Sequence, residues 1–264
     1  MRNTGIELSL NADAIRTKDF DWNISLNLAH NENEVTRLSN DVFTMDKILL
    51  GDVFIRGGSS SGTHVLEEGR PIGQFYGLVC NGIDENGRYI MVDKDGDGEI
   101  SDPADYDYIG SAQPKLTYGI TNTFRYKNVS LSVFLNAQLG QTANNWLYDV
   151  SHNSYRQNRL MVDFWTPENP TNKYPKNSLD TSVNPMSAGF YEKTDFLRVQ
   201  DVTLAYRVPQ RWLKKISLNR LEVYMNIKNL ATWTSWTGLD PEFISDQQST
   251  PQVRSFTFGL KLDL

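Results

Sequence analysis

The most constraining feature of this chain is a strict alternation of apolar and polar residues over stretches much longer than an ordinary strand. In KLTYGITNTFRY, residues 115–126, one phase holds Leu116, Tyr118, Ile120, Phe124 and Tyr126, and the other holds Lys115, Thr117, Thr121, Thr123 and Arg125. A two-residue period places the two phases on opposite faces of a β-strand. NVSLSVFLNAQL repeats this pattern after Lys127, so the two stretches predict a hairpin with a tight turn.

Two further hairpins and one final strand show the same alternation. Strands are expected at residues 6–14 and 20–28, at 202–208 and 221–227, and at 254–264. Leu197 and Val199 fall out of phase with the rest of their strand, which predicts a β-bulge near Arg198. The chain should therefore form about seven long antiparallel strands.

Charged residues are confined to the polar phase of these strands. They are Glu7, Asp13, Asp21, Lys115, Arg125, Asp201, Arg207, Glu222, Lys228, Lys261 and Asp263, whereas the apolar phase carries Arg254 alone, at a strand end. One face of the sheet is thus kept free of charge. Alternation by itself leaves open whether this face meets lipid or a protein core, because a soluble β-sandwich has the same pattern.

The lengths of the connections favour lipid. Short turns of three, one and eleven residues, at 16–18, 127 and 209–219, alternate with connections of 84, 55 and 22 residues, at 31–114, 140–194 and 231–252. This arrangement is typical of transmembrane β-barrels, whose long loops are extracellular. Aromatic residues gather at the strand ends, as interfacial girdles require. Phe20, Trp22, Phe124, Tyr126, Tyr206 and Trp212 lie at the short-turn end, and Trp146, Tyr148, Phe196, Trp233 and Trp236 lie at the other.

Composition excludes several other classes of protein. A net charge of −6 without any Lys/Arg-rich run argues against a nucleic-acid partner. The lone Cys80 allows neither an internal disulfide nor a structural zinc site. The chain has no apolar run long enough for a transmembrane helix, and its first residues do not resemble a signal peptide. Taken alone these tests would place the protein in the cytoplasm, which the strand pattern contradicts.

Several segments together resemble one known family. In chain order they are NTGIELSL, RPIGQFYGLVCNGI, DKDGDGEI, DFLRVQDVTLAYRVPQRWLKK, LEVYMNIKNLATWT, GLDPE and SFTFGLKLDL. With these segments the chain resembles the C-terminal part of the SusC/RagA family of TonB-linked outer-membrane proteins, which are TonB-dependent receptors. The combination is much more specific than any single segment.

This resemblance implies an all-β fold, namely an antiparallel transmembrane β-barrel segment of about seven strands, the last third of a 22-stranded barrel. Residues 1–264 would form the C-terminal part of that barrel, with the plug domain and the earlier strands absent. It also implies a place in the cell outer membrane, against lipid. The full-length protein would import glycans or peptides with a SusD-like lipoprotein and would reach the TonB complex through its missing N-terminal part. Such transport is not catalysis, so no enzyme is expected.

One segment carries metal-site chemistry. DKDGDGEISDPAD, residues 93–105, offers Asp93, Asp95, Asp97 and the Glu99 carbonyl at the spacing of an EF-hand loop. Its twelfth position is Ala104, so a bidentate closing ligand is missing, and Asp102 or Asp105 could substitute for it. The sequence leaves two alternatives: one bound Ca²⁺ or a solvated turn. No other cofactor is expected.

Aromatic residues of the long loops also have two interpretations. Trp146, Tyr148, Trp233 and Trp236 could contact a ligand by stacking on sugar rings, or they could serve as girdle and loop-packing residues. RGGSSSG lacks the ending of a phosphate-binding loop, and no motif supports a catalytic histidine. The alternative to the transporter is a soluble all-β module that binds carbohydrate with the help of calcium.

Overall fold

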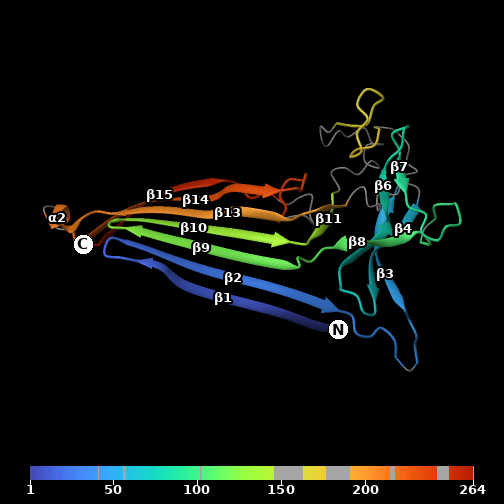
Figure 1. Cartoon of the computed structure of the whole chain (residues 1–264), viewed down its shortest axis with the longest axis horizontal. Coiled ribbons are helices and arrows are strands. Elements are labelled where there is room, and N and C mark those ends of the chain that lie inside the picture. The colour runs from blue at the N-terminus through green and yellow to red at the C-terminus, as the bar shows by residue number, and fades with distance from the viewer. Residues whose placement is uncertain are drawn as a thin grey trace.

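The computed structural model describes residues 1–40, 42–55, 58–101, 103–145, 163–176, 191–214, 218–242 and 250–263. These residues form one long sheet and a group of smaller sheets at one end of it (Figure 1). Almost all regular structure is antiparallel β, and helix α2 (Gln210–Leu213) is a single turn. Within the described ranges, no helix has both the length and the apolarity needed to cross a membrane.

The long sheet contains the seven strands that the alternation predicts, in the order β1-β2-β9-β10-β13-β14-β15. Their bounds are β1 (Arg2–Arg16), β2 (Phe20–Glu34), β9 (Leu116–Tyr126), β10 (Val129–Leu139), β13 (Phe196–Arg207), β14 (Arg220–Thr234) and β15 (Ser255–Asp263). Every neighbouring pair is antiparallel. The predicted fold class is therefore confirmed, and β1 and β15 are the two open edges of the sheet.

The two faces of this sheet differ as the sequence predicts. On the apolar face, Ile6 is 69% exposed, Phe258 is 74% exposed and Leu260 is 64% exposed. On the polar face, Ser9 Oγ donates to Asn27 Oδ1 over 2.9 Å, a contact between neighbouring strands. Because these apolar side chains have no protein layer above them among the residues that the structure describes, the described sheet is not packed as half of a sandwich.

Hydrogen bonds join the short turns at one end of the sheet. The Lys127 N–H donates to the Asp19 carbonyl over 2.8 Å, which links the β9–β10 turn to the β1–β2 turn. The Arg207 N–H donates to the Asn128 carbonyl over 2.8 Å, and Asn128 Nδ2 returns a bond of 2.9 Å to the Arg207 carbonyl. Lys127 has a φ of 51°, as the predicted tight turn requires.

The predicted bulge lies two residues from Arg198. Opposite β10 the register passes from Asp201 to Val199, so that Gln200 is the extra residue. On the β14 side, Asp201 pairs with Lys228 and Val199 pairs with Ala231, so that two residues of β14 are skipped. Asn229, one of the two residues skipped there, has a φ of 52°. The bulge exchanges the faces of the first residues of β13, Phe196 to Val199, relative to the rest of the strand, since each added residue reverses the alternation.

The connection at 31–114 contains folded structure that the alternation does not predict. We call residues 47–111 the loop module. It holds a four-stranded sheet of β3 (Lys47–Ile55), β4 (Gly58–Glu67), β5 (Gln74–Leu78) and β8 (Tyr106–Ser111), and the pair β6 (Cys80–Ile83) and β7 (Tyr89–Met91). Beside it lies the short pair β11 (Thr142–Asn144) and β12 (Tyr191–Lys193), as Figure 1 shows for β11. Val65, Tyr76, Leu78 and Tyr106 form a buried core in the module.

Candidate functional site

The polar face of the seven-stranded sheet is one candidate functional surface. Its side chains pair across strands, as in the bond of 2.8 Å from Asn226 Nδ2 to Asp201 Oδ1. Near the short turns it has a hollow of about 350 Å³, and two loose ion pairs lie there, Arg16 with Asp13 at 3.6 Å and Arg125 with Asp21 at 3.9 Å. Exposed charges of this kind keep a wall hydrated, which suits the inside of a barrel.

Asn122 is a polar side chain in the apolar phase of β9. Asn122 pairs with Ile24 and Val133, between residues of the apolar face. Trp22 Nε1 donates to Asn122 Oδ1 over 3.2 Å, and the Trp22 ring stacks on Phe124 with centroids 5.6 Å apart. A polar group that faces lipid is costly unless it is hydrogen-bonded. Trp22 therefore satisfies Asn122 while keeping an apolar surface outward.

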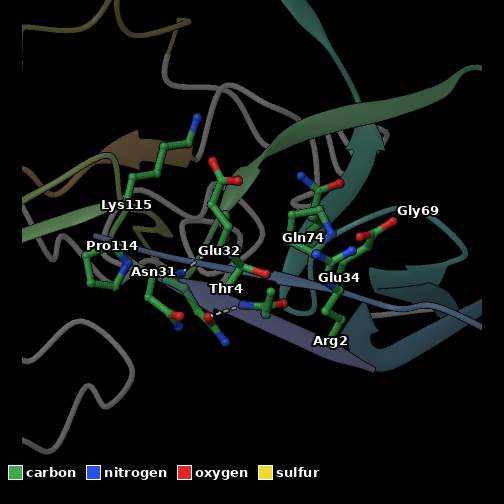
Figure 2. A pocket seen from close by; sticks show the side chains of 13 residues that line it. Arg2, Thr4, Asn31, Glu32, Glu34, Gly69, Gln74, Pro114 and Lys115 are labelled. Carbon is green, nitrogen blue, oxygen red and sulfur yellow. Dashed lines mark hydrogen bonds between the residues drawn. The ribbon is translucent and has the colours of Figure 1, made fainter. Parts of the chain in front are cut away.

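A pocket of about 390 Å³ lies where the sheet meets the loop module (Figure 2). It is lined by Arg2, Thr4, Asn31, Glu32, Asn33, Glu34, Gly69, Pro71, Gln74, Ser111, Gln113, Pro114 and Lys115. Asn33 joins the two parts, because its Nδ2 donates to Gln113 Oε1 over 2.5 Å and its Oδ1 accepts the Ile72 N–H over 2.6 Å. No motif predicts this pocket, since its walls come from four separate segments of the chain.

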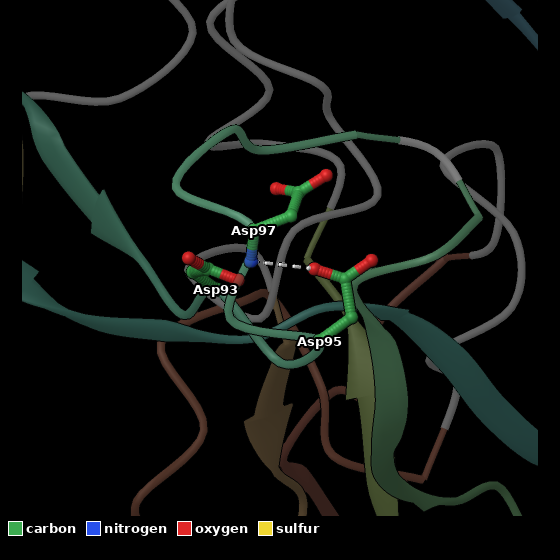
Figure 3. A group of neighbouring side chains, drawn as sticks. All are labelled: Asp93, Asp95 and Asp97. Carbon is green, nitrogen blue, oxygen red and sulfur yellow. Dashed lines mark hydrogen bonds between the residues drawn. The ribbon is translucent and has the colours of Figure 1, made fainter.

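The Asp/Gly loop is preorganised by its own backbone. Asp93 accepts the N–H groups of Gly96 and Gly98 over 2.6 and 2.9 Å, and Asp95 accepts that of Asp97 over 3.1 Å. Oxygen atoms of these three aspartates lie within 4.8 Å of one another (Figure 3). Three carboxylates this close together repel one another, and a hard cation such as Ca²⁺ relieves that repulsion. The metal ligation predicted for Asp93, Asp95, Asp97 and Glu99 stays a prediction.

Asp105 closes the same loop from the other side. Its side chain accepts the N–H groups of Lys94 and Ser101, each over 2.7 Å, and the residue is 1% exposed. The N–H groups of Ser101 and Lys94 hold the pKa of Asp105 below its ordinary value, since they stabilise the carboxylate. Asp105 thus ties the two ends of the loop together, a role that the sequence spacing did not suggest. Asp102 lies outside the described residues.

Two of the four aromatic candidates, Trp233 and Trp236, lie in the described part of the chain, and they differ in exposure. Trp233 is 58% exposed at the outer end of β14. Trp236 is only 9% exposed, and its ring packs so closely on Gly238 that an added Cβ would lie 2.4 Å from Trp236 Nε1. This burial agrees with the loop-packing interpretation of Trp236. Trp146 and Tyr148 lie outside the described residues, and their contact with a ligand stays a prediction.

Two aromatic residues assigned to the outer girdle are buried instead. Trp236 is one of them, and Phe196 is the other, at 2% exposed. The reason for Phe196 is the bulge at Gln200, which turns the even-numbered residues at the start of β13 to the polar face. There the Arg198 guanidinium lies 5.3 Å from the Phe196 ring. The girdle prediction is therefore wrong for these two residues.

No family model matches the chain, but individual proteins match it over nearly its whole length. TonB-dependent receptor P3 of Formosa agariphila is 28% identical over 299 residues, which cover 99% of this chain and 28% of that protein. TonB-dependent receptor SusC of Bacteroides thetaiotaomicron is 30% identical over 271 residues, which cover 100% of this chain and 26% of that protein. The chain thus spans little more than a quarter of these relatives.

Solved structures give the same result. The structure of the RagAB peptide transporter matches with a TM-score of 0.78 at 25% identity, and the match covers 98% of this chain and 29% of the other. The RagAB peptide importer in its closed-closed state matches with a TM-score of 0.78 at 26% identity, covering 98% and 29%. These relatives are receptors and transporters and not enzymes, as expected. The predicted resemblance is confirmed.

Proposed function

Because the chain has the sequence and the fold of a segment of a SusC/RagA-type TonB-dependent receptor, we propose that it forms barrel wall in an energy-coupled importer of the cell outer membrane. The apolar face of the sheet would contact lipid, and the polar face would line the hydrated interior. The long connections would form an extracellular vestibule.

The observation that carries this proposal is the two-faced sheet. Its apolar face leaves large side chains open to the surroundings, among them Ile6, Phe256, Phe258, Leu260 and Leu262, each at least 54% exposed. In water such a contiguous surface drives aggregation, whereas in a bilayer it is the required surface. The polar face, in contrast, satisfies its amides and carboxylates by hydrogen bonds between strands.

We propose a glycan or a peptide as the substrate and a SusD-like lipoprotein as the partner above the vestibule. The RagAB structures are those of a peptide transporter, which supports the peptide half of this proposal. An exposed Trp233 at the vestibule end supports the glycan half, because indole faces stack on sugar rings. We also propose one Ca²⁺ in the 93–105 loop, where three aspartates converge.

Uptake by whole cells tests this function. Cells that make the full-length receptor should accumulate a labelled oligosaccharide or a labelled peptide, and removal of the SusD-like lipoprotein or of TonB should each reduce uptake. An uptake rate that does not change without TonB would contradict energy-coupled import. When both probes are tested in one strain, the probe that accumulates identifies the substrate class. The effect of removing TonB then tests the mechanism separately.

The alternative, a soluble calcium-assisted carbohydrate-binding module, makes the opposite prediction for the isolated chain. Residues 1–264 should aggregate or require detergent, because two sheet edges and one apolar face are open. A monomer that stays soluble without detergent, unfolds cooperatively and binds glycan would overturn the transporter proposal in favour of this module.

A further inference from the structure

Arg198 is a charged side chain buried inside the barrel wall. Its side chain is 2% exposed and forms ion pairs with Asp240, 2.7 Å from Nη2, and Glu242, 3.0 Å from Nη1. Its Nε donates to Thr232 Oγ1 over 3.1 Å. Burial of a guanidinium costs several kcal/mol unless carboxylates and hydrogen bonds compensate it. The position of Arg198 therefore depends on both acidic residues.

The bulge in β13 is what brings Arg198 to these partners. In an unbroken strand, residue 198 would share the face of Val202 and Leu204, which belong to the apolar phase. The extra residue Gln200 reverses the faces, so that Arg198 lies opposite Asn136 of β10 and Thr232 of β14 on the polar face. Without the bulge a cation would point at lipid, and with it the same cation points into the barrel.

The acidic partners of Arg198 lie in the connection between β14 and β15. They also bind Gln252, near the other end of this connection. Asp240 accepts the Gln252 N–H over 3.1 Å, and Gln252 Nε2 donates to Glu242 over 2.7 Å. The Glu242 N–H also donates to Asp240, over 3.0 Å. The start and the end of this connection are thus both linked to Arg198 of β13. We call residues 235–242 and 250–253 the strap.

The strap has a second attachment, to the β11–β12 pair. Thr237 donates its N–H to Glu192 over 3.1 Å and its hydroxyl over 2.6 Å. Asn145, which is 1% exposed, donates to Thr237 Oγ1 over 3.0 Å. The β11–β12 pair in turn contacts the loop module, because the Tyr191 and Phe75 rings pack with centroids 4.8 Å apart. A continuous set of contacts thus runs from the barrel wall to the module.

We propose that Arg198 is the positioning residue of this strap, and that it makes the strap, the β11–β12 pair and the loop module one preformed vestibule. Three loops that are far apart in the sequence would then hold a fixed shape above the barrel, where independent loops would each move. Any gating movement of the receptor must in that case come from parts outside this unit. This role of Arg198 rests on the barrel function proposed above and is the same for a glycan or a peptide substrate, with or without bound calcium.

Amide hydrogen exchange of the full-length receptor in detergent tests the proposal. Arg198→Met removes the cation and leaves the buried Asp240 and the partly buried Glu242 without it, so exchange in 235–242 and 250–253 should become at least about tenfold faster. A smaller acceleration should reach 142–145 and 191–193. Strands β9 and β10 should keep their wild-type rates.

Arg125→Met is the matched control, because Arg125 also lies on the polar face but its ion pair with Asp21 spans 3.9 Å between side chains 63% and 41% exposed. This variant should exchange like the wild type. Arg198→Lys keeps the charge but loses the forked geometry that binds two carboxylates, so its strap should show an intermediate rate. If Arg198→Met fails to assemble, Arg198→Lys provides the same comparison.

Three outcomes would overturn the proposal. The first is a strap that exchanges at wild-type rates in both Arg198 variants, which would mean that Arg198 does not hold it. The second is a uniform acceleration across the whole sheet, which would make Arg198 a support of the barrel alone. The third is a faster strap beside an unchanged β11–β12 pair, which would separate the strap from the rest of the vestibule.

Discussion

The seven-stranded sheet and the loop module are both antiparallel β, yet they treat apolar residues in opposite ways. In the sheet, Phe258 and Leu260 are 74% and 64% exposed, whereas in the module Val65 and Tyr106 are 0% and 2% exposed. The sheet keeps its polar groups on the face opposite its apolar residues, whereas the module encloses its apolar residues between its own strands. Under the function proposed above, one chain therefore contains an apolar face that lipid would cover and an apolar core that the protein itself buries.

The two regions also differ in what their backbone N–H groups bond to. Outside the sheet, carboxylates close the loops by accepting backbone N–H groups, as Glu68 does from Leu38 and Ser39. The Leu38 N–H is the main reason that the pKa of Glu68 lies below its ordinary value. Such contacts order loops in water without any apolar cover. Changes in the module should therefore stay local, while changes on the apolar face of the sheet should depend on the membrane.

The largest effect should come from the core of the module. Tyr106→Ala removes a ring that packs edge-on against Tyr76 with centroids 5.6 Å apart, and it should destabilise the module by about 3–5 kcal/mol. Amide exchange of residues 64–78 in the full-length receptor measures this. Tyr126→Ala, at a ring 55% exposed on the sheet, is the control and should leave those residues unchanged. Equal acceleration in the strands of the sheet would show that the two regions are not independent.

A smaller effect is expected when one strand is charged on either face. Val133→Arg places a cation on the lipid side of β10 and should cost roughly 2–4 kcal/mol near the bilayer midplane. Ser132→Arg, one residue earlier on the polar face, should cost well under half of that amount. Urea unfolding of the receptor in lipid bilayers compares the two. Similar costs for both variants would contradict the assignment of the faces.

The next effect is confined to the loop that Asp105 closes. The pKa of Asp105 is lower in the folded protein than in the unfolded chain, where it is about 3.9. Its contribution to stability is therefore present above that value and is lost as the pH falls through the lower folded value. Asp105→Asn should speed exchange of residues 94–101 severalfold at neutral pH. After correction for intrinsic rates, wild-type protection that already falls between pH 7 and pH 5 would contradict this.

The smallest effect on the stability of the fold should come from the metal loop, since the ion would act on Asp95 and Asp97, which are exposed, and on Asp93, which is only partly buried. Calorimetric titration of the full-length receptor with calcium should show one site, and Asp95→Ala or Asp97→Ala should weaken it at least about tenfold. Asp84→Ala is the control, because Asp84 also accepts backbone N–H groups, from Asn86 and Arg88, but lies outside the cluster. An absence of heat in the wild type would leave the loop as a turn.

The sheet was predictable because the sequence pattern that specifies each strand lies within that strand. Each strand carries its own alternation, so the hairpin around Lys127 and the bulge near Arg198 could both be inferred from adjacent residues. The module was not predictable, because its strands are short and its packing joins distant residues. Gly87, for example, has a φ of 77°, and an added Cβ there would lie 2.5 Å from the Trp165 ring.

The same distinction applies to the candidate sites. The three aspartates of the metal loop could be found from their spacing, which sets their convergence directly. The roles of Asp105 and Arg198 could not, because their partners are fixed only once the loops have folded. Arg198 meets Asp240 across 42 positions of sequence, and the register of a bulge decides whether they meet at all.

The loop module also has a consequence for the order of folding. Between Glu34 and Leu116 the chain has 81 residues, yet β2 and β9 must pair as direct neighbours. The module brings the two ends together, since the Val35 N–H bonds to the Arg70 carbonyl and the Ala112 N–H bonds to the Gly73 carbonyl. A loop shortened from 81 residues to about five loses four doublings of length, or about 2.4 kcal/mol of closure entropy. A module that folds first in water would therefore prepare the hairpin-like pairing of β2 with β9 before either strand enters the bilayer.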